Sequence, residues 1–102
     1  MDSFSPRVSG PRIRPPEKYR SIGEQTTVLL RNIQAILRAA GVGMDDVVQS
    51  TVHLQYPKRD FAEFNAAYAG FFTEPYPVRT TVGSELNNIL VEIDVTVALP
   101  VH

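Results

Sequence analysis

The chain has 102 residues and a net charge of −1, and its 43% hydrophobic and 21% charged residues are typical of one globular domain. The balanced charge gives no general attraction to nucleic acid, and the absence of cysteine excludes disulfides, thiolate catalysis and cysteine-based zinc sites. The two histidines, His53 and His102, are not spaced from other ligand residues as in a metal site. No apolar run is long enough to cross a bilayer, and the N-terminus lacks the apolar core of a signal peptide. We therefore expect a cytoplasmic protein without nucleic-acid or membrane partners.

The first 20 residues are interrupted by prolines and show little periodicity. Residues 4–10 could hold a short strand that stops at Ser9-Gly10, and residues 11–18 are typical of an extended loop. We interpret the basic side chains of this segment as solvated; they are Arg7, Arg12, Arg14, Lys18 and Arg20.

The next two elements are a helix and a strand. Ser21 and Glu24 fit an S-x-x-E capping box, and Gly41 follows the last periodic residue as a glycine stop, which predicts a helix over about 22–40. After a turn at 44–46, residues 47–55 alternate as in a strand. One predicted face carries Val48, Ser50, Val52 and Leu54, and the other, more polar face carries Val47, Gln49, Thr51 and His53.

A second helix is predicted from Phe61 to about Phe72, with Asp60 as its N-cap. Its aromatic stripe is more often part of a core than of a ligand site; the stripe is Phe61, Phe64, Tyr68, Phe71 and Phe72. Asn65 lies within this stripe, where an asparagine is mildly unfavourable, so it either has a polar partner or points to water.

Two β-like runs near the C-terminus, residues 77–82 and 89–97, carry Arg79 and Glu92. If the apolar residues of both runs face one core, these two side chains point together to the opposite side of the sheet. Arg79 could there bind a substrate carboxylate while Glu92 handles a proton or a water. The alternative is a cross-strand salt bridge on a solvated face.

The elements predict a single α+β domain over 1–102, in the order strand, helix, strand, helix, strand, strand. Two helices can cover only one face of the sheet. The other face has mixed polarity, so we expect a closed homo-oligomer with Arg79 and Glu92 near the subunit boundary. A monomer with a solvated antiparallel face is the competing interpretation.

Several ordered motifs resemble the RidA/YjgF family, also called the endoribonuclease L-PSP family. They are NIQAILRAAG at 32–41, DDVVQSTVHL at 45–54, DF at 60–61, FNA at 64–66, YA at 68–69, FF at 71–72, PVRTTV at 77–82 and VEI at 91–93. The resemblance covers about residues 21–98, with a weaker match at Val8-Ser9-Gly10. It implies a chorismate-mutase-like fold, a mixed sheet with two helices on one face, and a homotrimer with sites between subunits.

The resemblance also implies hydrolysis of reactive enamines and imines, such as 2-aminoacrylate, to a 2-keto acid and ammonia without a metal or organic cofactor. By position, Arg79 matches the arginine that binds the substrate carboxylate and Glu92 the glutamate that positions water. Three further residues match pocket positions of the family: Thr81, Asn65 and Ser9.

The chain departs from the family pattern at its N-terminus and near residue 85. Only eight residues precede Ser9, so we expect the first family strand and its aromatic residue to be missing. Pro11 replaces the usual glutamine, and the connection 83–88 is short. These departures leave open a non-catalytic, trimeric small-carboxylate-binding or regulatory protein. A ribonuclease or translation inhibitor is the least favoured function, because the chain has no paired catalytic histidines and little net charge.

Overall fold

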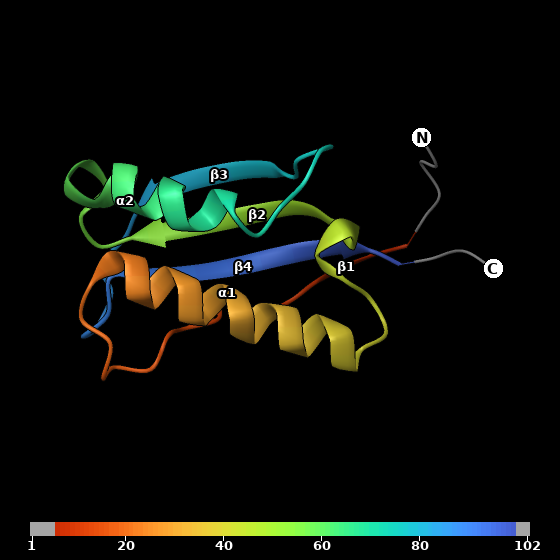
Figure 1. Ribbon diagram of the computed structural model, residues 1–102, viewed down its shortest axis with the longest axis horizontal. Coiled ribbons are helices and arrows are strands. Elements are labelled where there is room, and N and C mark those ends of the chain that lie inside the picture. Colours follow the sequence, from red (N-terminus) through yellow and green to blue (C-terminus); the bar gives the residue numbers. More distant parts are fainter. Residues whose placement is uncertain (1–5, 100–102) are drawn as a thin grey trace.

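The computed structural model describes residues 6–99, and in it two helices pack on one face of a four-stranded sheet (Figure 1). The elements are β1 (Arg7–Ser9), α1 (Ile22–Ala39), the 3-10 turn η1 (Met44–Asp46), β2 (Val47–Leu54), α2 (Pro57–Ala69), β3 (Val78–Gly83) and β4 (Val91–Ala98). The strand order is β1-β4-β2-β3, with β2 and β3 parallel and the other pairs antiparallel. The predicted α+β class and element order are confirmed, while Phe4 of the predicted first strand lies outside the described residues.

Both ends of α1 are formed as the sequence predicts. The Ser21 hydroxyl accepts a hydrogen bond from the Glu24 amide at 3.1 Å and contacts the Glu24 carboxylate at 3.0 Å. At the other end Gly41 has φ +82°, and its amide donates to the Arg38 carbonyl while the Val42 amide donates to the Leu37 carbonyl. These two bonds form a Schellman motif, which satisfies the last carbonyls of the helix.

Helix α2 begins earlier than predicted. Pro57 occupies its first turn, where the fixed φ of proline suits a helix and its missing N–H costs no hydrogen bond. Asp60 therefore lies inside the helix and is not the N-cap, and the helix ends at Ala69 rather than Phe72. Of the predicted aromatic stripe, Phe64, Tyr68 and Phe72 are buried, whereas Phe61 is exposed.

The core lies between the helices and the helix-facing side of the sheet. Its fully buried aliphatic side chains come from α1, β2 and β4; they are Leu29, Leu30, Val52, Leu54, Val91 and Ile93. Val47 also joins this core, contrary to the prediction, because a register shift between Val47 and Gln49 turns it toward the helices opposite Val97. Within residues 6–99 the helices are too short or too polar to cross a membrane.

Candidate functional site

The sheet places Arg79 and Glu92 on opposite faces, so the prediction that they point the same way is wrong. Arg79 aligns with Ser50 in the parallel β2–β3 pair, and the Ser50 hydroxyl meets the Tyr68 hydroxyl of α2 at 2.7 Å. Arg79 therefore lies on the helix-facing side. Glu92 aligns with His53 in the antiparallel β2–β4 pair, on the side that neither α1 nor α2 covers. We call this second side the open face.

In β3 the alternation of apolar residues predicts the wrong buried face, because this strand lies at the edge of the sheet. Its valines, Val78 and Val82, are 68% and 36% exposed on the open face. On the other side the long Arg79 side chain lies under α2, where its guanidinium carbon is 4.9 Å from the ring centre of Tyr68 and 5.6 Å from that of Phe64. Aromatic rings stabilise a cation in this position, so an arginine can replace an aliphatic residue there.

Asn65 has the polar partner that its position in α2 required. Its side-chain oxygen accepts a hydrogen bond of 2.7 Å from Arg79 Nη1. Within the described part of the chain, no carboxylate forms an ion pair with Arg79. Thr81, half-buried, follows two residues later on the same side of β3. Arg79, Asn65 and Thr81 thus form a helix-side group with a fixed positive charge and unused guanidinium donors.

The ring of Tyr68 packs against the Arg79 guanidinium of this group. Burial raises the pKa of the Tyr68 phenol, and the hydrogen bond to Ser50 and the charge of Arg79 offset part of that increase. The phenol is therefore a neutral hydrogen-bonding group at neutral pH, in van der Waals reach of the arginine that it helps to hold.

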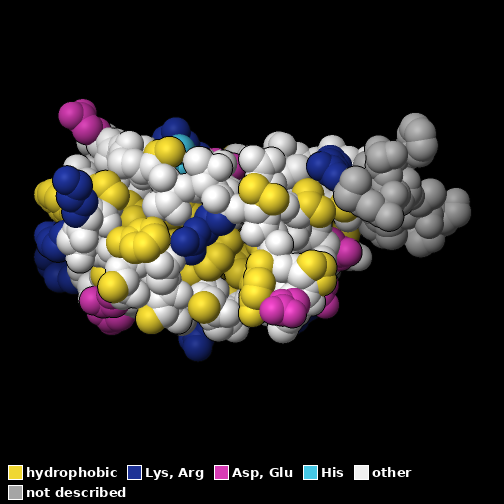
Figure 2. All heavy atoms as spheres, turned by 90° about the horizontal axis from the view of Figure 1, so that it is seen from above, with side chains coloured by type: hydrophobic (Ala, Val, Ile, Leu, Met, Phe, Trp, Pro, Cys, Tyr) yellow, Lys and Arg dark blue, Asp and Glu magenta, His cyan; other side chains and the backbone are white. Residues whose placement is uncertain are grey.

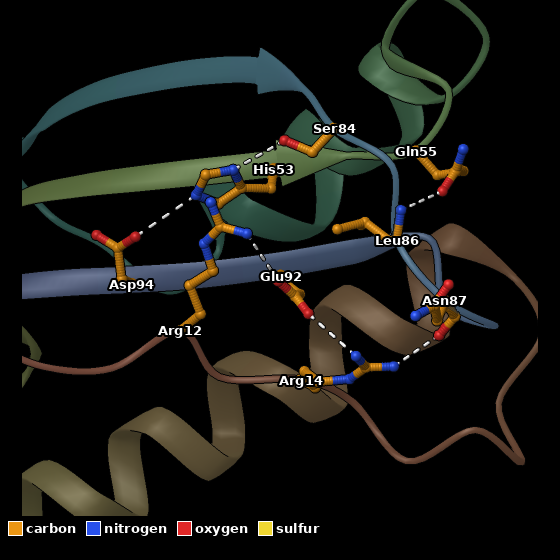
Figure 3. A network of polar contacts seen from close by, with 9 residues as sticks. All are labelled: Arg12, Arg14, His53, Gln55, Ser84, Leu86, Asn87, Glu92 and Asp94. Carbon is orange, nitrogen blue, oxygen red and sulfur yellow. Dashed lines mark hydrogen bonds and ion pairs between the residues drawn. The ribbon is translucent and has the colours of Figure 1, made fainter.

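On the open face, Glu92 is only 6% exposed and is held by two arginines (Figure 3). Arg12 Nη1 lies 3.4 Å from one carboxylate oxygen and Arg14 Nη1 lies 3.4 Å from the other. Arg14 also donates to the Asn87 carbonyl at 2.6 Å. The interpretation of Arg12 and Arg14 as merely solvated is thus wrong, although each side chain remains about half exposed.

The signal for this pairing was present in the sequence. Arg12 and Arg14 flank Ile13, an apolar residue between two polar ones, as in a strand. Ile13 indeed forms a β-bridge with Ile93, so its two neighbours point to the Glu92 side of the sheet.

His53 and Ser9 also lie on the open face. His53 Nδ1 is 3.0 Å from the Ser84 hydroxyl, and Nε2 is 3.5 Å from the Asp94 carboxylate. Ser9 lies in β1, opposite Thr96 of β4, and the two hydroxyls are hydrogen-bonded at 2.9 Å. Residues 6–99 contain no cluster of His, Asp or Glu that could hold a metal ion.

The five predicted site residues therefore form two groups. Arg79, Asn65 and Thr81 lie under α2, and Glu92 and Ser9 lie on the open face. The first group can bind an anion through the free guanidinium donors, and the second can accept or return a proton at a buried carboxylate. Within one chain the sheet separates the two functions.

The edge formed by α2 and β3 exposes large hydrophobic side chains. Figure 2 shows them together with basic side chains on the surface seen from above Figure 1. The exposed ones of this region are Tyr56, Phe61, Tyr76, Val78 and Val82. We call these residues the edge patch. Several exposed apolar side chains gathered along one edge of a protein are typical of a surface that contacts another protein.

Comparison with known proteins identifies the family. The sequence model described as Endoribonuclease L-PSP matches residues 15–99. The RutC family protein SSO3206 of Saccharolobus solfataricus is 45% identical over 74% of this chain and 61% of its own length. The 2-iminobutanoate/2-iminopropanoate deaminase of Salmonella typhimurium is 39% identical over 60% of this chain and 49% of its own length. The chain thus spans about half to three fifths of these relatives.

Solved structures agree with this assignment. Rv2704, a YjgF-family protein of Mycobacterium tuberculosis, superposes with a TM-score of 0.83 at 25% identity, over 94% of this chain and 81% of its own. Escherichia coli TdcF with bound serine gives a TM-score of 0.83 at 27% identity, over 98% of this chain and 85% of its own. The fold is the chorismate-mutase-like fold of YjgF proteins, and the chain belongs to the RidA/YjgF, or Endoribonuclease L-PSP, family.

Proposed function

We propose that this protein hydrolyses reactive enamines and imines, such as 2-aminoacrylate, to a 2-keto acid and ammonia. The observation that carries the proposal is the Arg79 guanidinium, held by Asn65 and aromatic rings with donors left over for a carboxylate. The deaminase name of the Salmonella relative supports the same chemistry.

In this reaction Arg79 binds the substrate carboxylate. A guanidinium offers paired N–H donors, which fix the orientation of a carboxylate as well as its position. Asn65 and the rings of Phe64 and Tyr68 hold the arginine before substrate arrives, so little side-chain entropy is lost on binding. Thr81, on the same side of β3 as Arg79, provides a neighbouring hydroxyl.

Glu92 positions the water that attacks the imine carbon. It accepts a proton as the carbon–oxygen bond forms, and a proton returned to nitrogen allows ammonia to leave as the carbonyl forms. Arg12 and Arg14 each contact one Glu92 oxygen, and together they fix the carboxylate on the open face.

The opposite orientation of Arg79 and Glu92 leads us to include the homotrimer in the proposal. One chain cannot bring the two side chains to one substrate, since the sheet lies between them. In a closed ring of three chains, the helix-side group of one chain can meet the Glu92 group of the next. The edge patch supplies exposed apolar surface at β3, the edge strand that carries Arg79, for such a contact.

A coupled assay tests the chemistry. A serine or threonine dehydratase generates the imine, and its decay is followed with wild type, Arg79→Ala and Glu92→Gln. We expect faster decay with wild type and a loss of about 100-fold in kcat/KM for Arg79→Ala, the effect of removing a charge-assisted contact of about 2.7 kcal/mol. Full activity of a folded Arg79→Ala protein would contradict the proposed role.

A mixing experiment tests the shared site. Refolding Arg79→Ala with Glu92→Gln in equal amounts leaves about one site in four with both native side chains if sites lie between chains. We therefore expect the mixture to recover about a quarter of wild-type activity, whereas each variant alone stays inactive. Mixed trimers without any recovery would show that the two residues do not share a site.

Binding of a small carboxylate without turnover is the second candidate function. It is favoured by the structure of TdcF with bound serine, whose superposition covers 98% of this chain. It predicts that calorimetry detects serine or a 2-keto acid binding to wild type but not to Arg79→Ala, while the coupled assay shows no acceleration. Acceleration of imine decay by wild type would exclude it.

A further inference from the structure

Arg12 is less engaged than Arg14, the other arginine at Glu92 (Figure 3). Arg14 places one guanidinium nitrogen 3.4 Å from Glu92 and donates with the other to the Asn87 carbonyl at 2.6 Å. Arg12 places only Nη1 near Glu92, at 3.4 Å, and its side chain has no other hydrogen bond or ion pair within residues 6–99. A guanidinium carries several N–H donors in a planar fork, so most donors of Arg12 remain unused.

The Glu92 carboxylate does not fully occupy Arg12. A close charge-assisted hydrogen bond joins nitrogen and oxygen at about 2.7–2.9 Å, whereas both arginines lie 3.4 Å from Glu92. The carboxylate is buried, but the Arg12 side chain is 53% exposed. Arg12 thus presents an accessible guanidinium beside a buried acid, where a second carboxylate arriving from solvent can bind.

The proposed reaction brings the side chain of the substrate to this guanidinium. The attacking water lies within hydrogen-bond reach of Glu92 and about 3–3.5 Å from the imine carbon. The substrate side chain begins at that same carbon, and Arg12 is in direct contact with Glu92. A carboxylate one or two carbons beyond the imine carbon is therefore within reach of the long Arg12 side chain.

Asp94 is the acid that opposes this role. It lies two residues beyond Glu92 in β4, so it shares the open face. Its carboxylate is 3.5 Å from His53 Nε2, and none of the described arginines forms an ion pair with it. Arg12 and Arg14 together balance Glu92 and Asp94, so the net charge of these four groups does not attract an anion. A preference for a second carboxylate must come from direct contact with Arg12, and removal of the Asp94 charge should strengthen it.

We propose that Arg12 binds a second carboxylate at the far end of the substrate side chain, so that the protein prefers imines of acidic amino acids, such as those of aspartate and glutamate. Water adds to the carbon–nitrogen double bond, the carbon–nitrogen bond breaks and ammonia leaves, which gives a 2-keto dicarboxylic acid. The inference rests on the proposed function for turnover, because Glu92 then positions the water. Arg12 is thereby a specificity-determining residue as well as a neighbour of Glu92.

A binding experiment tests the site without turnover. Calorimetry compares 2-oxoglutarate with 2-oxopentanoate, which has the same chain length but a methyl group in place of the second carboxylate. We expect wild type to bind 2-oxoglutarate about tenfold more tightly, a modest factor because a half-exposed guanidinium stays partly solvated. Arg12→Gln should bring this ratio close to one, and Asp94→Asn should raise it. Arg38→Gln is the control, because it removes the same charge from an exposed position of α1 and should leave the ratio unchanged. Equal ratios in wild type and Arg12→Gln would overturn the inference.

A kinetic experiment separates the inference from the proposed function. Amino-acid oxidases generate the imine of glutamate or of norvaline, and kcat/KM is measured for both with wild type, Arg12→Gln and Arg12→Lys. The ratio of the two values cancels any change that the variants cause at Glu92, because both imines need the same water. We expect a ratio of about ten in wild type, near one in Arg12→Gln and an intermediate value in Arg12→Lys, which keeps the charge without the fork.

The possible outcomes are distinct. Hydrolysis of both imines by wild type with equal kcat/KM would overturn the role of Arg12 and leave the proposed function intact. Tighter binding of 2-oxoglutarate that depends on Arg12, without hydrolysis of either imine, would sustain the second carboxylate site while the proposed function fails. A folded wild-type protein that neither binds the two keto acids nor hydrolyses the imines would overturn both.

Discussion

Asn65 holds Arg79 without neutralising it, and this difference between an amide and a carboxylate can be tested. Asn65→Asp places a carboxylate at the 2.7 Å contact with Arg79, where it competes with the carboxylate of the substrate. We expect KM to rise about tenfold or more, because hydrogen bonds to charged groups contribute about 1.5–3 kcal/mol. Steady-state kinetics measures the effect. Asn65→Ala is the control, since it frees Arg79 without a competing charge and should raise KM less.

The Ser50–Tyr68 hydrogen bond stabilises the tyrosine that packs against Arg79. Ser50 is 1% exposed, so Tyr68→Phe leaves its hydroxyl buried without a partner and should cost about 1–3 kcal/mol of unfolding free energy. Urea unfolding measures this. Combining Ser50→Ala with Tyr68→Phe removes both polar groups, so the double variant should lose less than the sum of the single losses. Strict additivity would show that the two hydroxyls are not coupled.

Tyr68 also links stability to alkaline pH. Burial raises the pKa of the Tyr68 phenol above its ordinary value of 10.0, so the unfolded chain releases this proton first as pH rises. The contribution to stability is complete below pH 10 and is lost as pH rises through the raised pKa. We expect the unfolding free energy of Tyr68→Phe to fall less steeply than that of wild type above pH 10, measured by urea unfolding at several pH values.

At the scale of elements, the end of α1 depends on one glycine. Gly41 has φ +82°, a conformation that costs an L-residue about 1–2 kcal/mol, so Gly41→Ala should lower the unfolding free energy by about that amount. Gly43 is the control, because its φ is −134° and an added methyl group would meet no atom within 4 Å. Thermal unfolding of the two variants distinguishes them. Equal losses would mean that the φ angle is not the cause.

The elements that the sequence predicts well are those with local signals. The cap at Ser21 and the stop at Gly41 fix α1 through atoms within a few residues, and alternation marks β2 and β4 because both are central strands with one buried face. The sequence predicts the start of α2 too late, because Asp60 is a good N-cap in isolation, whereas the helix already begins at Pro57.

Which way the site residues point cannot be predicted from the alternation of apolar and polar residues alone, because it depends on contacts between distant parts of the chain. Val47 turns inward because of a register shift, which depends on pairing with β4. Arg79 lies under α2 because aromatic rings of that helix can stack on it, whereas the valines of β3 remain exposed at the sheet edge. The roles of Arg12 and Arg14 likewise depend on Ile13 bridging to Ile93, a contact 80 residues apart in sequence.

At the scale of the whole molecule, the exposed valines of β3 connect assembly with activity. Val78 is 68% exposed within the edge patch, so Val78→Glu would place a carboxylate in the contact between chains and should dissociate the proposed trimer. Ile36→Glu is the control, because Ile36 is 53% exposed on α1, away from the edge patch. Light scattering after gel filtration measures the mass, and circular dichroism verifies that each variant is folded.

The same pair of variants links the mass of the assembly to catalysis. Arg79 and Glu92 are intact in Val78→Glu, but they remain on opposite faces of one sheet in a dissociated chain. We therefore expect imine hydrolysis to fall in proportion to the loss of trimer and to return at protein concentrations that restore it, whereas Ile36→Glu keeps both mass and activity. A folded Val78→Glu monomer with wild-type activity would require each chain to bring Arg79 and Glu92 together by itself, which this sheet does not allow.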